Sequence, residues 1–100
     1  MSVEHRKLVT IVTEAALEHE LVAEIQRLGA TGYTITDARG KGGRGVRNAS
    51  WTQSANIRIE VVCQAAIADA IAALLRARYY DNYAMILFIG EVTVLRPEKF

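Results

Sequence analysis

The chain has 100 residues, of which 51% are hydrophobic, and its formal net charge is +1. This length predicts one domain with a small core, and a net charge near zero excludes an overall field that would attract nucleic acid or a membrane surface. The single cysteine, Cys63, excludes an intramolecular disulfide and a cysteine-based metal site. No apolar run reaches membrane-spanning length, so we expect a cytoplasmic protein.

The first part of the chain predicts a strand, a helix and a second strand. Residues 6–13, RKLVTIVT, are rich in β-branched side chains and predict a buried strand. Thr13 is expected to cap a helix that begins at Glu14 and stops at Gly29. Residues 33–38, YTITDA, predict the second strand. The apolar residues of the helix recur at helical spacing: Leu17, Leu21, Ile25 and Leu28.

The second part repeats this order. Residues 56–63, NIRIEVVC, alternate apolar and polar side chains, which predicts a half-buried strand. An alanine-rich helix follows and ends near Tyr79, and residues 80–83 form a turn. Residues 84–95 predict a last strand, interrupted at Gly90.

The resulting order, βαββαβ, predicts an α+β ferredoxin-like fold. Four antiparallel strands form one sheet, and both helices cover the same face. The other face is then uncovered, and its expected residues include Val62, part of the last strand, Thr10 and Thr34. An uncovered, partly apolar face indicates oligomerisation.

The connection between the second and third strands, residues 39–54, is unusual. The stretch from Ala38 to Gln53 holds four of the seven glycines and four of the twelve basic residues, and no acidic residue occurs between Asp37 and Glu60. Connections of about fifteen residues without structure of their own are uncommon in compact domains, and most of them are functional or disordered.

We compared three functions for this segment. A dinucleotide fingerprint, Gly40-x-Gly42-x-x-Gly45, is rejected, because the fingerprint requires a helix after the glycines and a strand follows instead. An RNA-binding loop is an alternative, although the strand at 56–63 has no aromatic residue for base stacking. An anion-binding loop would use backbone amides and forked arginines. The spacing of the residues by itself supports anion binding and a solvated cationic hairpin without a ligand about equally.

Five segments in chain order resemble the PII signalling proteins. They are KLVTIVTE (7–14), GATGYTI (29–35), GKGGRGVR (40–47), ANIRIEV (55–61) and RYYDNYAMILFI (78–89). The similarity is greatest to the PII-like branch associated with inorganic carbon: SbtB-type partners of bicarbonate transporters and the carboxysome-associated PII protein, CPII. The resemblance implies a single PII-like domain over residues 1–100, with a flexible T-loop at about 39–54.

The resemblance also implies a function. We expect a homotrimer that binds ADP or AMP, together with bicarbonate, in clefts between subunits, and that signals carbon status to a bicarbonate transporter or a carboxysome component. No cofactor, metal or nucleic acid is expected. The chain is predicted not to be an enzyme, with slow hydrolysis of nucleotide phosphate as the one catalytic alternative. The predicted nucleotide site comprises Thr13, Thr34, Gly40, Lys41, Gly42, Arg44, Arg47, Phe88, Ile89 and Gly90.

The chain departs from the family pattern at several places. Other branches carry a Gly-Asp-Gly-Lys step where this chain reads Phe88-Ile89-Gly90-Glu91, so an acid replaces the lysine that neutralises a triphosphate. We therefore expect ADP or AMP to bind at least as well as ATP. The loop has no tyrosine for uridylylation. Phe100 is not followed by the cysteine-bearing extension of the transporter-associated type, which favours the carboxysome-associated type.

Overall fold

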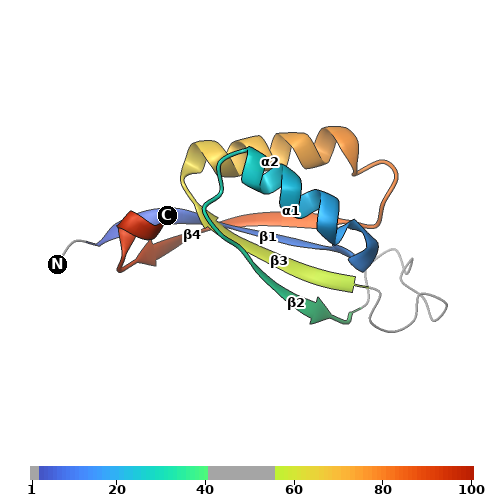
Figure 1. Ribbon diagram of the computed structural model, residues 1–100, viewed down its shortest axis with the longest axis horizontal. Helices are drawn as coiled ribbons and strands as arrows, with labels where there is room; N and C mark the ends of the chain where they lie inside the picture. The colour runs from blue at the N-terminus through green and yellow to red at the C-terminus, as the bar shows by residue number, and fades with distance from the viewer. Residues whose placement is uncertain (1–2, 41–55) are drawn as a thin grey trace.

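A computed structural model describes residues 3–40 and 56–100 of the chain (Figure 1). The order of elements confirms the predicted ferredoxin-like fold. The strands are β1 (Glu4–Glu14), β2 (Thr34–Ala38), β3 (Asn56–Cys63) and β4 (Ile86–Val94), and the helices are α1 (Glu18–Arg27) and α2 (Ala65–Arg78). Two short 3-10 turns complete it, η1 (Ala15–Leu17) and η3 (Pro97–Lys99).

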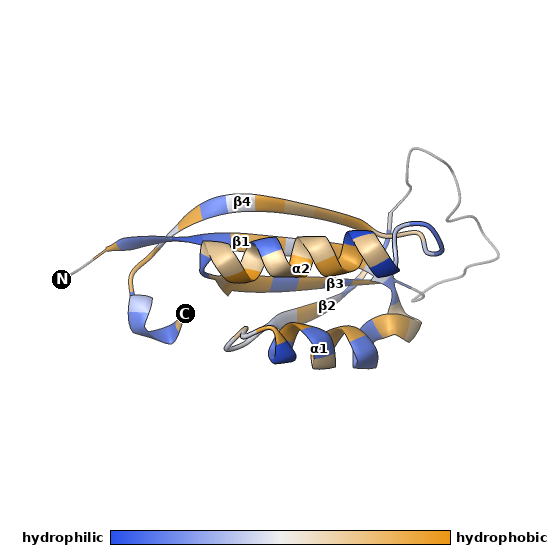
Figure 2. Cartoon of the chain, turned by 90° about the horizontal axis from the view of Figure 1, so that it is seen from above, coloured by the Kyte–Doolittle hydropathy of each residue, from blue (hydrophilic) through white to orange (hydrophobic). Residues whose placement is uncertain are grey.

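The four strands form one antiparallel sheet in the order β2-β3-β1-β4. Both helices lie on the same face of this sheet, and the opposite face carries no layer of the chain (Figure 1). The edge strands are therefore β2 and β4, and the central strands are β3 and β1. Apolar residues run along most of α2, whereas α1 mixes apolar and polar positions (Figure 2).

The core lies between the sheet and the helix layer. Alternate residues of β1 and β3 point toward the helices, because successive side chains of a strand point to opposite faces. Full burial of one such aliphatic side chain stabilises the fold by about 1.5–3 kcal/mol. The large fully buried aliphatic residues, each at 0–2% exposure, are Val9, Ile11, Leu21, Ile25, Ile57, Ile59, Val61, Ile71 and Leu75.

Helix α1 ends at the predicted glycine. Gly29 has φ 112°, a left-handed conformation that favours glycine. The amide of Gly29 donates to the carbonyl of Gln26 (3.0 Å) and the amide of Ala30 to that of Ile25 (3.1 Å), which is the Schellman pattern. A Cβ at position 29 would lie 3.3 Å from Cδ1 of Ile67 in α2, so the missing side chain also lets the two helices approach.

The predicted start of the first helix is wrong. Strand β1 continues through Thr13 and Glu14, which pair with Ile57 and Asn56 of β3, and η1 then precedes α1. Thr13 caps nothing, because its side chain is fully buried and its hydroxyl donates to the carbonyl of Ala84 at 3.4 Å. The pairing partner on β3 and the part-buried acceptor at residue 84 override the local capping preference.

Two strand predictions also need correction. Strand β1 begins two residues before Arg6, because the polar residues from Glu4 onward pair with β4 as far as Val94. Strand β4 runs from Ile86 to Val94 without a break at Gly90, which pairs with Leu8. A glycine lacks a side chain to pack, but it does not prevent ladder hydrogen bonds when both neighbours continue the strand.

Candidate functional site

The uncovered face of the sheet carries two rows of side chains that cross all four strands. The strand register places Thr34, Glu60, Thr10 and Phe88 in one row, from β2 to β4. Directly opposite residues of antiparallel strands point to the same face. The sequence analysis expected Thr10 and Thr34 on this face, and the register confirms both. The next row comprises Thr36, Arg58, Val12 and Ile86.

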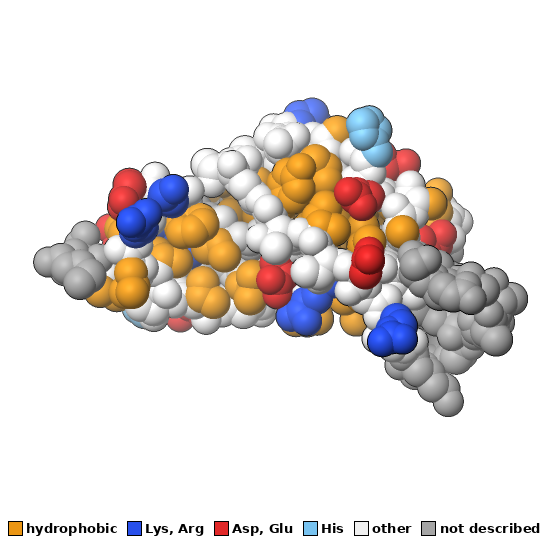
Figure 3. Space-filling view, turned by 60° about the horizontal axis from the view of Figure 1, so that its bottom comes forward, with side chains coloured by type: hydrophobic (Ala, Val, Ile, Leu, Met, Phe, Trp, Pro, Cys, Tyr) orange, Lys and Arg blue, Asp and Glu red, His pale blue; other side chains and the backbone are white. Residues whose placement is uncertain are grey.

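These rows are polar near β2 and apolar near β4. Arg58 and Glu60 of β3 form an ion pair at 2.9 Å (Nη2 to Oε2), with side chains 49% and 35% exposed. On β4, Phe88 is 53% exposed and Ile86 51% exposed. Figure 3 turns this side of the molecule toward the viewer and shows apolar side chains beside a small number of charged ones. One face thus offers both hydrogen-bonding groups and an aromatic surface.

The predicted site residues are divided between the two edges of the sheet. Thr34 lies on β2, and Gly40 follows the end of that strand; both are exposed. Phe88, Ile89 and Gly90 lie on β4, at the opposite edge, with two strands between the groups. A single chain therefore does not bring the two groups together. Lys41, Gly42, Arg44 and Arg47 lie outside the described residues.

Strand geometry also separates neighbouring members of the predicted site. Phe88 and Gly90 face the uncovered side, whereas Ile89 pairs with Val9 and points toward the helix side. Thr13 is fully buried on the helix side, opposite to Thr34. Glu91 forms a cross-strand ion pair with Lys7, from Oε2 to Nζ at 3.8 Å. Residues 88–91 therefore form part of a continuous strand rather than a glycine-rich loop.

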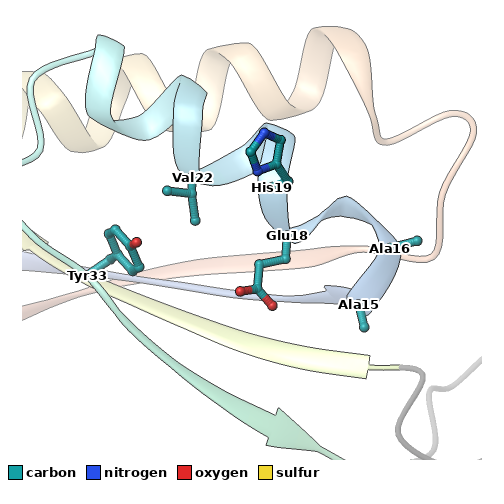
Figure 4. A pocket seen from close by; sticks show the side chains of 6 residues that line it. All are labelled: Ala15, Ala16, Glu18, His19, Val22 and Tyr33. Carbon is teal, nitrogen blue, oxygen red and sulfur yellow. The ribbon is translucent and has the colours of Figure 1, made fainter.

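The sequence analysis missed two features beside β2. One is the Arg58–Glu60 pair, whose signal was the alternation of charged and apolar residues in β3. The other is a hollow of about 310 Å³ on the helix side of β2 (Figure 4). No local pattern predicts this hollow, because its walls come from separate elements: Ala15, Ala16, Glu18, His19, Val22 and Tyr33.

Other kinds of site find little support in the part of the chain that the structure describes. Those residues contain no group of three or more His, Cys, Asp or Glu side chains that could hold a metal ion. Cys63 is buried, and burial raises the pKa of its thiol, which disfavours the reactive thiolate. No helix described here is both long and apolar enough to cross a membrane.

Comparison with known proteins identifies the family. The model of the nitrogen regulatory protein P-II family matches residues 6–99. The chain belongs to the P-II family. P-II proteins are signalling proteins rather than enzymes, which agrees with the predicted lack of catalytic activity. P-II proteins are typically trimers that bind adenine nucleotides.

Solved P-II structures agree with this membership. A PII-like signalling protein of Thermus thermophilus is 46% identical, with a TM-score of 0.85, and the alignment covers 100% of this chain and 99% of that one. CPII of Thiomonas intermedia, bound to ADP and bicarbonate, has a TM-score of 0.86 at 23% identity, covering 99% of this chain and 97% of that chain. The apo form of CPII has a TM-score of 0.76 at 18% identity, covering 93% and 95%. The resemblance to CPII therefore concerns the fold.

Proposed function

We propose that this P-II protein senses inorganic carbon by binding ADP or AMP, together with bicarbonate, in clefts between the subunits of a homotrimer. The observation that carries the proposal is the division of the predicted site between the two edge strands. Thr34 and Gly40 on β2 and Phe88 on β4 can line one cleft only if β2 of one subunit approaches β4 of another. The single-domain reading, with residues 39–54 as the T-loop, is part of this proposal.

Charge on the uncovered face gives the nucleotide an orientation. Glu60 lies beside Thr34 in the first row, and its carboxylate would repel a phosphate there. The same carboxylate can accept hydrogen bonds from a sugar, and the threonine hydroxyl can donate to a sugar oxygen or accept from a sugar hydroxyl. Strands β2 and β3 lead from this point toward the segment that carries Arg44 and Arg47. We therefore place the sugar and base near Thr34 and the phosphates toward the loop.

An exposed aromatic ring supports the base end of this arrangement. Phe88 presents its side chain on the uncovered face at the edge of the sheet. An aromatic ring stacks on any base through its π-face, which contributes to binding without selecting a phosphate number. Glu91 follows on the same strand but points to the helix side, where it contacts Lys7 at 3.8 Å. The expected preference for ADP or AMP over ATP therefore rests on the P-II resemblance, in which a lysine occupies the position of Glu91.

Bicarbonate would join the phosphates as a second anion that the loop cations hold. Solved CPII structures contain ADP with bicarbonate, or ADP and AMP with bicarbonate. CPII is 22–23% identical to this chain in these two structures, and its ligands motivate the proposal. In this proposal the protein acts in the cytoplasm and signals to a bicarbonate transporter or a carboxysome component.

A double substitution in the loop tests the proposal. Each charge-assisted contact contributes roughly 1.5–3 kcal/mol, so Arg44→Ala with Arg47→Ala should weaken ADP binding by about a hundredfold or more. Bicarbonate should tighten ADP binding in the parent protein and not in the double variant. Isothermal titration calorimetry with and without bicarbonate measures both effects. Circular dichroism should show an unchanged fold, because the substituted residues lie between strands.

A control at a site outside the loop is Arg76→Ala, which removes one cation from the exposed side of α2. It should leave ADP affinity unchanged. A double variant that binds ADP as tightly as the parent would contradict the loop's role. Retention of single-stranded RNA at physiological salt, without heat from ADP, would instead favour the RNA-binding alternative. Against this alternative, the central strands β1 and β3 contain no Phe, Tyr or Trp on which a base could stack.

A further inference from the structure

The hollow on the helix side of β2 is a second candidate binding site, and it is separate from the proposed nucleotide site. It lies between η1, the start of α1 and the residue that precedes β2 (Figure 4). Tyr33 and Thr34 are neighbours in sequence, but Tyr33 lines the hollow whereas Thr34 points to the uncovered face. The two sites are thus on opposite faces of the same edge strand.

The lining combines an aromatic wall, aliphatic walls and one carboxylate. Tyr33 is 42% exposed and presents its ring to the hollow. Ala15 and Val22 provide aliphatic surface, and Glu18 projects its carboxylate into the same space (Figure 4). Among residues 3–40 and 56–100, His19 is the one further titratable side chain that lines the hollow besides Glu18 and Tyr33, and no described lysine or arginine lines it.

The carboxylate of Glu18 is unpartnered within the described chain. In residues 3–40 and 56–100 it has neither a hydrogen-bonding nor an ion-pair partner. By contrast, the next two glutamates of α1 are engaged: Glu20 accepts from Tyr79, and Glu24 pairs with Arg27 and Arg78. Glu14, immediately before η1, adds a further negative charge without a described ion-pair partner. The surroundings of the hollow are therefore acidic.

We propose that this hollow binds an arginine side chain of a partner protein. A guanidinium stacks on an aromatic face and forks onto a carboxylate, and its aliphatic stem packs against apolar walls. The hollow supplies all three features in one place: the ring of Tyr33, the carboxylate of Glu18 and the aliphatic surface of Ala15 and Val22. A lysine would form the charge contact but would lose the planar stacking and the fork, so the site distinguishes the two cations.

A neutral isostere of arginine tests the assignment. The probes are N-acetyl-arginine N-methylamide and the corresponding citrulline compound, which has the same shape without the charge. Each is titrated at millimolar concentration into the ¹⁵N-labelled full chain, and amide shifts are followed by NMR. We expect the arginine probe to shift the amides of residues 15–22 and 33, and the citrulline probe to shift none of them. Equal shifts from both probes, or shifts confined to other residues, would overturn the proposal.

Substitutions identify the groups that bind. Glu18→Gln and Tyr33→Leu should each raise the dissociation constant of the arginine probe about threefold or more, as expected for exposed charge and cation–π contacts. Tyr33→Phe keeps the ring and should bind like the parent. Asp69→Asn removes the same charge from exposed α2 surface that does not line the hollow, and it should also bind like the parent. Unchanged affinity in both Glu18→Gln and Tyr33→Leu would exclude the site.

Discussion

At the scale of single residues, one hydroxyl joins the two helices. Tyr79, at the end of α2, is 5% exposed and donates from Oη to Oε2 of Glu20 in α1 at 2.6 Å. Burial raises the pKa of Tyr79 to about 12 from its ordinary value of 10, and the nearby carboxylate of Glu20 acts in the same direction. Ionisation would place two negative charges side by side in a poorly hydrated position.

This shift predicts how stability depends on alkaline pH. Because the pKa in the folded state lies above that in the unfolded state, the contribution of Tyr79 is complete below pH 10 and is lost as pH rises toward 12. Urea unfolding should therefore show a free energy of unfolding that falls more steeply over this range in the parent than in Tyr79→Phe. At neutral pH, Tyr79→Phe should cost about 1 kcal/mol, the usual contribution of one hydrogen bond.

The matched control is Tyr83→Phe. Tyr83 is 38% exposed, and its ring packs against Tyr79 at 5.6 Å between centroids, but its hydroxyl has no hydrogen bond to a described residue. This variant should keep the parent's alkaline profile. An identical profile for Tyr79→Phe and the parent would show that the hydroxyl does not titrate with unfolding.

At the scale of elements, Arg6 fixes the C-terminal turn η3 against β1. Its guanidinium donates to the carbonyl of Pro97 at 3.1 Å and to that of Phe100 at 3.4 Å, and its side chain is only 12% exposed. Thr31, in the loop before β2, donates from its hydroxyl to the carbonyl of Lys99 at 2.9 Å. Segments from both ends and the middle of the chain therefore meet here.

Arg6→Ala should release this turn. Loss of charge-assisted hydrogen bonds to backbone carbonyls should lower the free energy of unfolding by about 2 kcal/mol, and amides 97–100 should exchange faster with solvent. Chemical denaturation and hydrogen exchange measure the two effects. Arg96→Ala is the control, because Arg96 is exposed and its side chain has no partner among the described residues. Equal stability of the two variants would mean that the Arg6 contacts do not hold η3.

At the scale of the whole molecule, the uncovered sheet face is the candidate subunit interface. Phe88 and Ile86 are each more than half exposed on one edge of this face, and Val62, Leu8 and Val12 are half-buried on the same face. Apolar residues in such a continuous arrangement are typical of subunit interfaces. The proposed trimer would bury them and would also bring β2 of one subunit toward β4 of another.

Phe88→Asp should prevent this assembly. A charge placed in a buried apolar interface costs several kcal/mol unless it is paired. Light scattering with size-exclusion chromatography should show a trimer for the parent and a smaller species for the variant, and ADP binding should fall with the loss of the cleft. Ala66→Asp adds the same charge on exposed α2 surface and should remain trimeric. A trimeric Phe88→Asp protein would exclude this face as the interface.

Local patterns in the sequence determined the number, order and type of the α-helices and β-strands. Periodicity in α1 and β3 and the glycine at position 29 act over a few residues, so they can be read without a fold, and the cationic composition of residues 39–54 is equally local. The tertiary structure decided the rest. Thr13 became a buried strand residue because its pairing partner and its acceptor lie 44 and 71 residues away in sequence. The separation of Thr34 and Phe88 on opposite edges and the hollow at Tyr33 and Glu18 likewise depend on sheet register and helix packing, because those contacts join residues that no local pattern relates.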